Sequence, residues 1–226
     1  MSLARWIVAV VAPVPLFGLP LLLGAGRWDW WQAWVFLGAV TIASSASLVS
    51  LRHHPDLLRE RFKPPLQRGQ PLADKVVLLA FIALFFGLIA FIGADVFRLQ
   101  LLPTPAPLVA WAGLVLFSAA WAVMTWAMTA NAFAAPVVRH QRERQQRVVD
   151  TGPYRVVRHP MYAGAALLLI GMPLWLGSTA GALLAALPIG LLALRIRIEE
   201  RFLARELSGY EAYARRVRYR LVPFVW

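Results

Sequence analysis

Polar residues of several chemical types gather immediately before one apolar block near the C-terminus. An arginine and a histidine, Arg158 and His159, are flanked by two tyrosines, Tyr154 and Tyr162. Pro160 is suited to the first position of a helix, so these side chains collect at a helix start. The free N–H groups and positive dipole end of a helix favour an anionic group, and Arg158 adds a bidentate partner for a carboxylate or phosphate. The stretch therefore predicts an anion-binding site.

A second polar cluster follows the same apolar block and contains Arg195, Arg197, Glu199 and Glu200. Taken singly, Arg195 with Glu199 and Arg197 with Glu200 have the spacing of ordinary surface ion pairs on a helix. Tyrosines and arginines at a membrane interface are equally ordinary. An acid, a base, a histidine and two tyrosines that converge on one place favour a functional site instead.

The composition indicates that a lipid bilayer surrounds most of this chain. Of its 226 residues, 60% are hydrophobic and 15% are charged, whereas soluble domains carry roughly 25% charged residues. The net charge of +12 would suggest nucleic-acid binding in a soluble protein. Here the charges lie between apolar blocks, so anionic lipid headgroups are the expected partners and nucleic acid is not. The chain has no cysteine, which excludes disulfides and thiolate chemistry.

Five uncharged stretches are each long enough to cross a membrane. The first is interpreted as a retained, proline-kinked helix and not as a cleaved signal. The last is too long for one span, and a break at 177–181 divides it into two arms of roughly 17 residues. We expect an all-α polytopic membrane protein with four transmembrane helices plus a C-terminal helical hairpin. The stretches run from Trp6 to Gly26, Trp30 to Leu51, Val76 to Ala94, Leu99 to Val138, where the helix is expected from Pro107 to Met128, and Pro160 to Leu194.

The basic residues predict the orientation of these helices. Twenty of the 23 Lys and Arg residues lie in residues 52–75, 139–158 and 195–226, and this topology places all three segments on one side. Only Arg27 and Arg98 fall on the other side. The positive-inside rule then places the N-terminus, the mouth of the hairpin and the C-terminus in the cytoplasm, in a protein of the bacterial inner membrane.

Several spaced motifs carry a resemblance to a known family. The sequence contains Gly152-Pro153-Tyr154, then Arg158-His159-Pro160-x-Tyr162-x-Gly164, then Glu199-Glu200 and Gly209-Tyr210-x-x-Tyr213. Together with the two-armed hairpin, this pattern resembles the C-terminal half of the isoprenylcysteine carboxyl methyltransferase family, over roughly residues 125 to 226. One position departs from the family: Gln146 stands where many members have a histidine.

The resemblance implies an integral membrane methyltransferase that binds S-adenosylmethionine at a cytosolic site, while a lipophilic substrate enters from the bilayer. It divides the chain into N-terminal transmembrane helices, 1–128, and a C-terminal catalytic region, 129–226, within one membrane domain. The family's cofactor-contacting positions fall on Gly152, Pro153, Tyr154, Arg158, His159, Pro160, Tyr162, Gly164, Glu199 and Glu200.

The residues themselves suggest roles in such a site. Arg158 and the helix N–H groups suit the carboxylate of the cofactor, Glu199 or Glu200 suits its ribose diol or ammonium, and Tyr154 or Tyr162 suits the adenine or sulfonium. Successive helix residues diverge by about 100°, so the two glutamates cannot both face the ligand equally, and Glu200 is slightly favoured.

The methyl acceptor determines which other residues take part. A carboxylate acceptor needs a cationic clamp, for which Arg195 and Arg197 are the candidates. An amine acceptor needs a base, and His159 or a glutamate is then the candidate. Asn131 either contacts the substrate or ends a helix.

Three other functions remain open from the sequence: a phospholipid or small-lipid N-methyltransferase, an NADPH-dependent sterol-type reductase, and a non-enzymatic membrane scaffold. We expect no metal site, because the pair His53-His54 lacks further ligands at helical spacing. The oligomeric state cannot be predicted.

Overall fold

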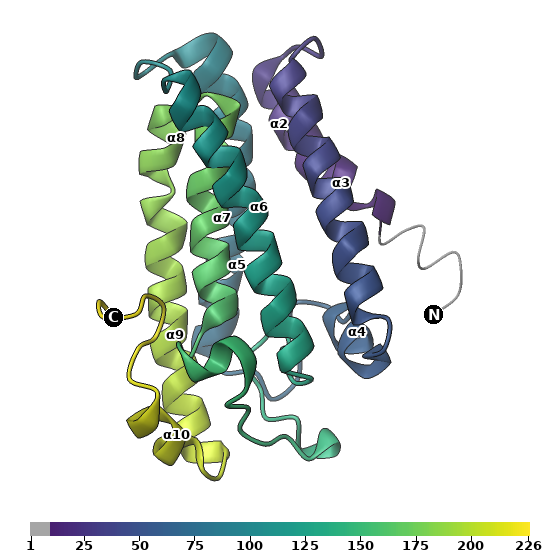
Figure 1. Cartoon of the computed structure of the whole chain (residues 1–226), viewed down its shortest axis with the longest axis vertical. Coiled ribbons are helices and arrows are strands. Elements are labelled where there is room, and N and C mark those ends of the chain that lie inside the picture. The colour runs from purple at the N-terminus through teal and green to yellow at the C-terminus, as the bar shows by residue number, and fades with distance from the viewer. Residues whose placement is uncertain (1–9) are drawn as a thin grey trace.

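The computed structural model describes residues 10–226, and within that range every regular element is helical. Long helices form a bundle that carries short helices and loops at both ends (Figure 1). The long elements are α2 (Pro13–Ala25), α3 (Trp31–Leu51), α5 (Leu72–Ala94) with a π-helical turn (Asp95–Leu99), α6 (Pro107–Ala130), α7 (Pro160–Leu176) and α9 (Ala186–Glu206). The short ones are α4 (Pro55–Arg61), the 3-10 turns Arg142–Arg144 and Gly152–Arg155, α8 (Thr179–Leu184) and α10 (Tyr210–Arg216).

Four helical segments are long and apolar enough to cross a membrane. They are Trp31–Leu51, Leu72–Leu99, Pro107–Ala130 and Thr179–Glu206. This set differs from the predicted four. Within the described residues the first apolar block forms α2, of 13 residues. The part of the predicted helix before residue 10 lies outside the described residues, and so does the N-terminus, whose side of the membrane was also predicted.

Prolines and a glycine set the ends of the helices around the site. Pro107 begins α6 and Pro160 begins α7, as the sequence predicts, because the fixed φ of proline suits a first helical position. The chain reverses after α7 at Gly177, which has φ 95°, and Ser178, whose hydroxyl caps α8.

The helical arms on the two sides of this reversal are unequal in length, whereas the sequence predicted two arms of similar length. The segment α7 has 17 residues, whereas α8 and α9 together form a candidate span from Thr179 to Glu206. The helix continues past Leu194 into the charged sequence because Arg195, its first charged residue, is paired with a buried aspartate of α5.

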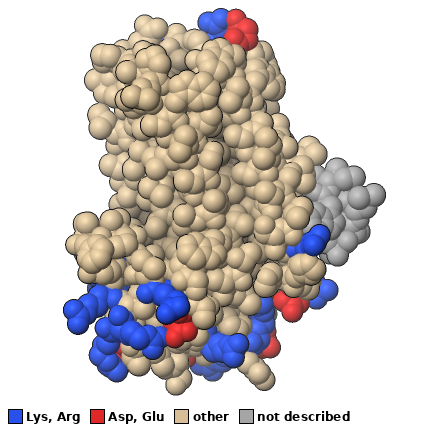
Figure 2. All heavy atoms as spheres, in the orientation of Figure 1, with Lys and Arg blue, Asp and Glu red and all other residues tan. Residues whose placement is uncertain are grey.

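Charge is distributed unevenly over the molecule. Lys and Arg side chains gather at the end where α4 and α10 lie, while the sides of the bundle are almost free of charge (Figure 2). At the opposite end, Arg27 is paired with its neighbour Asp29. This asymmetry agrees with an apolar middle inside a membrane and one basic end at its surface.

Helices α6 and α7 are in closer contact than any other pair. Glycines on both helices allow this approach, because a Cβ on Gly171 would lie 2.6 Å from the carbonyl oxygen of Gly113, and one on Gly164 would lie 2.9 Å from that of Ala120. Small residues let helix backbones approach closely in membranes. Gly164, which the resemblance assigned to the cofactor, therefore has a packing role in this structure.

We predict that Gly171→Ala destabilises the protein. The new methyl group would meet backbone atoms of α6 that cannot rotate away, and such overpacking costs about 1–3 kcal/mol. The measurement is the thermal unfolding midpoint in detergent. Gly190→Ala, in α9, is the matched control, since its Cβ meets nothing within 4 Å. An equal midpoint for both variants would contradict this account of the packing.

Candidate active site

A cavity of about 460 Å³ opens at the basic end of the bundle. Its walls come from segments far apart in the sequence: α4, α5, the loop after α6, the start of α7, α9 and α10. The side chains with a bearing on chemistry are Arg61, Lys63, Asn131, Arg139, Gln146, Arg147, Tyr154, Arg158, His159, Tyr162, Arg195, Glu199, Tyr210 and Tyr213.

One wall of this cavity is apolar and belongs to a membrane-spanning helix. Leu78, Phe81 and Ile82 of α5 line it together with Ala165 of α7 and Leu192 of α9. All three helices run along the length of the bundle (Figure 1). The cavity thus joins a lipid-compatible wall to a polar, basic mouth.

A buried ion pair connects α5 and α9 beside the cavity. Arg195 Nε donates to Asp74 Oδ1 at 2.8 Å, and Arg195 Nη2 donates to the carbonyl oxygen of Pro136 at 2.5 Å. Asp74 is fully buried, and its other oxygen accepts hydrogen bonds from Gln70 Nε2 and the Val138 N–H. Arg195 lines the cavity, but its charge is balanced by Asp74.

Glu200 is the centre of a separate, largely buried cluster. Its Oε1 accepts from Arg158 Nε at 2.7 Å and lies 3.2 Å from His159 Nε2, while its Oε2 accepts from Arg220 Nε at 2.8 Å. Arg158 Nη1 also donates to the carbonyl oxygens of Val217 and Arg218, just after α10. This cluster holds the start of α7, the end of α9 and the C-terminal segment together.

Glu199 faces the cavity, and its neighbour Glu200 does not line it. Tyr162 OH donates to Glu199 Oε2 at 2.6 Å, and the other oxygen, Oε1, has no hydrogen-bond partner among residues 10–226. The ring of Tyr162 lies between two other groups: it stacks on His159 and has the Arg195 guanidinium 5.7 Å from its centroid. A carboxylate oxygen and aromatic faces are thus presented together.

Three further tyrosines complete the polar mouth. Burial raises the pKa of Tyr154 to about 12, so its phenol is neutral at physiological pH. Tyr213 OH donates to the backbone oxygen of Tyr154 and fixes α10 against the Gly152–Arg155 turn. Tyr210 is buried and lines the cavity, yet its hydroxyl has no partner among the described residues. A buried hydroxyl without a partner is costly unless a ligand or water supplies one.

A comparison with protein-family models found a match in the C-terminal part of the chain. Residues 108–208 match the model described as phospholipid methyltransferase. The matched family is the group of membrane methyltransferases related to the isoprenylcysteine enzymes, so the resemblance is confirmed at the level of the family. No curated protein matches the chain.

Part of the phospholipid methyltransferase motif positions the site without lining the cavity. Gly152 has φ 57°, and a Cβ there would lie 3.0 Å from Ala130 Cβ at the end of α6. Pro153 and Pro160 shape the turn and the start of α7 and are buried. These three residues, with Gly164, fix the backbone around the cavity.

Three predicted roles need correction. Arg197 is exposed and does not line the cavity, because it lies about 200° around the helix from Arg195, so it cannot serve as a clamp there. The alternative of ordinary surface pairs, Arg195–Glu199 and Arg197–Glu200, is absent from the described residues, since Arg195 pairs with Asp74 and Glu200 with Arg158. Arg158 is occupied by Glu200 and backbone carbonyls. The favoured Glu200 gives way to Glu199 as the glutamate in the cavity.

Two other sequence predictions concern amides. Asn131 both ends α6 and lines the cavity, where its Oδ1 accepts from the Phe133 N–H. Gln146, the departure from the family pattern, also lines the cavity, and its Oε1 accepts from the Gln141 N–H at 2.8 Å. An uncharged amide therefore occupies the wall where a histidine is common.

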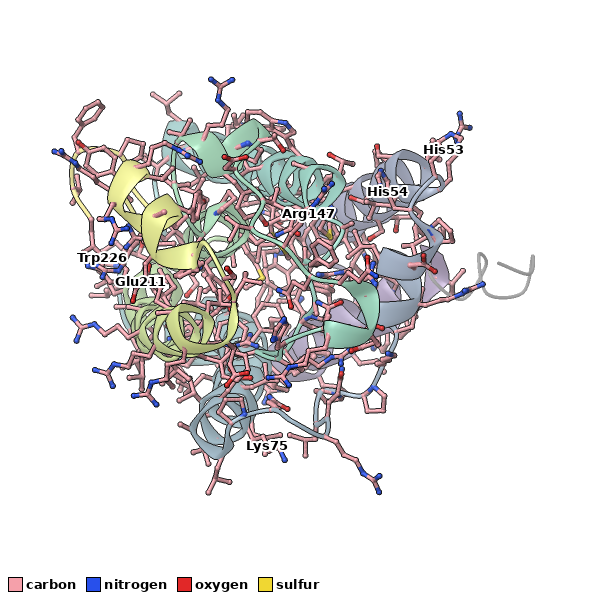
Figure 3. All side chains as sticks on the ribbon, turned by 90° about the horizontal axis from the view of Figure 1, so that it is seen from below. His53, His54, Lys75, Arg147, Glu211 and Trp226 are labelled. Atoms are coloured by element: carbon pink, nitrogen blue, oxygen red, sulfur yellow. The ribbon has the colours of Figure 1, made fainter. Side chains whose placement is uncertain are left out.

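No group of metal-binding residues occurs among the described residues. His53 and His54 lie at the periphery of the basic end, whereas Arg147 lies near its middle (Figure 3). Sequence reasoning missed Asp74, Arg61 and Glu60, although one signal was available: Asp74 is an acid in the first turn of a helix that is uncharged after Lys75, where a buried partner is to be expected.

We predict that Asp74→Ala lowers the free energy of unfolding by about 3–5 kcal/mol, because it leaves Arg195 buried without its counter-ion. Denaturation in detergent measures this loss. Asp56→Ala is the matched control, since Asp56 is exposed in its pair with Arg59 and such pairs contribute about 1 kcal/mol or less. Similar losses in both variants would contradict the role given to the buried pair.

Proposed function

We propose that this protein transfers a methyl group from S-adenosylmethionine to a lipophilic acceptor that enters from the bilayer. One observation carries the proposal: a single cavity joins an apolar wall on the membrane-spanning helix α5 to Glu199 and a set of tyrosines at the basic end. The family match supports methyl transfer, and the apolar wall supports a lipid acceptor. The combination favours this function over an NADPH-dependent reductase or a scaffold.

The polar part of the cavity fits S-adenosylmethionine chemically. The free oxygen of Glu199 suits the ammonium or the ribose diol, and the unpartnered hydroxyl of Tyr210 suits a polar group of the ligand. The rings of Tyr162 and Tyr154 offer faces for the adenine or the sulfonium. When bound, the cofactor supplies an electrophilic methyl group.

The remaining site residues act by position. Glu200, Arg158 and Arg220 hold the start of α7 against the end of α9, which keeps Tyr162 and Glu199 in one geometry. Methyl transfer by direct displacement requires mainly alignment of donor and acceptor and the exclusion of water. A site held by buried ion pairs meets the first requirement, and the apolar wall helps to meet the second.

The family resemblance favours the carboxylate of an isoprenylcysteine-type lipid as the methyl acceptor. A carboxylate is ionised at neutral pH and needs no base, and Arg195 is the predicted contact for it. The charge of Arg195 is already balanced by Asp74, so it would orient a carboxylate more than attract one.

A phospholipid amine is the second candidate acceptor, and one observation favours it. His159 lines the cavity with its Nε2 3.2 Å from Glu200 Oε1, which is the arrangement of a base oriented by a carboxylate. In both cases the positive-inside rule places the basic end, and hence the cavity mouth, in the cytoplasm.

The proposal predicts that S-adenosylmethionine and S-adenosylhomocysteine raise the thermal unfolding midpoint of the purified protein, since a ligand that binds the native state stabilises it. Glu199→Gln and Tyr210→Phe should each weaken this binding by about tenfold or more, which is the loss of a hydrogen bond worth about 1.4 kcal/mol. Glu206→Gln is the control on the same helix, because Glu206 pairs with Arg142 outside the cavity. NADPH is tested in parallel, and stabilisation by NADPH alone would refute the proposal.

A further inference from the structure

The charges around the cavity are not all balanced. Four of its six Lys and Arg side chains have a carboxylate partner: Lys63 with Glu60, Arg139 with Glu60 and Glu143, Arg158 with Glu200, and Arg195 with Asp74. Burial opposes the ionisation of Glu60, but hydrogen bonds from Lys63 and Arg139 outweigh it and lower its pKa. Among residues 10–226, the two basic side chains of the cavity without a carboxylate at salt-bridge distance are Arg61 and Arg147.

These two arginines lie in different environments. Arg147 is exposed near the middle of the basic face, where water solvates it (Figure 3). Arg61, at the end of α4, is partly buried, and its single hydrogen bond within the described chain runs from Nη1 to the carbonyl oxygen of Ala134 at 3.2 Å. Burial lowers the pKa of Arg61, as it does for a cation removed from water without a counter-ion.

A partly buried guanidinium that lines a cavity with most of its donors unused requires an acceptor. A guanidinium has five N–H donors in a fixed fork, which matches the oxygens of a carboxylate or a phosphate. Leaving it without an anion costs free energy, and the surrounding chain supplies no carboxylate to offset that cost. An oxyanion from outside the chain would supply the missing partner.

We propose that Arg61 binds the oxyanion of the acceptor lipid and so selects an anionic headgroup. The helix that carries Arg61 leads through the loop 62–71 into α5, whose Leu78, Phe81 and Ile82 form the apolar wall. A lipid tail on that wall places its headgroup at the basic mouth. This inference rests on the proposed function for the identity of the acceptor, and Arg61 lies outside the residues that match the family.

The oxyanion has two possible sources, and each predicts a different ligand preference. In the first, it is the carboxylate that receives the methyl group, held by Arg61 while its second oxygen attacks. The oxygen gains the methyl group, and the sulfonium becomes a neutral thioether. In the second, it is the phosphate of a phospholipid whose nearby amine receives the methyl group and releases a proton.

The test compares the binding of charged and uncharged lipids to the full-length protein in detergent. The probes are a farnesylated cysteine carboxylate against its methyl ester, and phosphatidic acid against diacylglycerol. Arg61→Gln should weaken binding of the charged member of one pair about tenfold or more, while binding of the uncharged member changes less than twofold. Arg61→Lys keeps the charge but loses the planar fork of donors, so its affinity for the charged member should lie between those of the original protein and Arg61→Gln.

Arg59→Gln is the matched control, because Arg59 lies on the same helix, pairs with Asp56 and does not line the cavity. It should bind every probe as the original protein does. Unfolding midpoints of all variants check that each is folded. The source of the oxyanion is identified by the pair of lipid probes, farnesylated cysteine or phosphatidic acid with its uncharged counterpart, for which Arg61→Gln abolishes the charge preference.

S-adenosylhomocysteine binding is measured in the same variants to separate the two proposals. Loss of that binding in Arg61→Gln with lipid binding unchanged would overturn the inference and assign Arg61 to the cofactor. No charge preference in the original protein, or an equal preference in Arg61→Gln, would also overturn it. If the charge preference depends on Arg61 but the protein binds no S-adenosylhomocysteine, the headgroup site is retained and methyl transfer is refuted.

Discussion

The Asp74 carboxylate organises the basic end of the molecule, because hydrogen bonds connect it to α9, to the loop after α6 and to Gln70 in the loop before α5. Arg195 of α9 donates to one oxygen, while Gln70 and the Val138 N–H donate to the other. Through Arg195, the loop after α6 is also held at Pro136. An unpaired charge at this depth would be strongly unfavourable, so the pair fixes the relative position of α5 and α9. The cavity lies directly beside it, and its shape depends on that position.

The pairing of charges also determines which groups remain available to a ligand. Asp74 balances Arg195, Glu200 balances Arg158, and Glu60 is shared by Lys63 and Arg139. These pairs are structural, and their partners are already oriented before any ligand arrives. Among the described residues, the groups left for a ligand include one oxygen of Glu199, the hydroxyl of Tyr210 and most of the Arg61 guanidinium, beside the exposed Arg147. This separation explains why residues adjacent in sequence, such as Glu199 and Glu200, have different roles.

The sequence was sufficient for those features that depend on local chemistry. Pro107 and Pro160 mark helix starts because their fixed φ acts within one turn, and the basic segments identify one end of the bundle because charge stays out of lipid. It was insufficient for the partner of each charge. Helical spacing offered Glu199 as an ordinary partner for Arg195, but the partner lies on α5, and no local rule relates residues on separate helices. The choice between Glu199 and Glu200 failed for the same reason, since the rotation of α9 is set by its packing and not by its own sequence.

The matched family region supplies most of the polar cavity, and the flanking segments complete it. Two backbone N–H groups just before α7, those of Arg158 and His159, donate to the carbonyl oxygens of Tyr219 and Arg220. The C-terminal segment thus satisfies these donors and, through Arg220, holds Glu200 from the side opposite to Arg158. On the other side, α4 and α5 provide Arg61 and the apolar wall. Under the proposed function, the matched region would fix the geometry around the methyl group, and the segments outside it would contact the lipid acceptor.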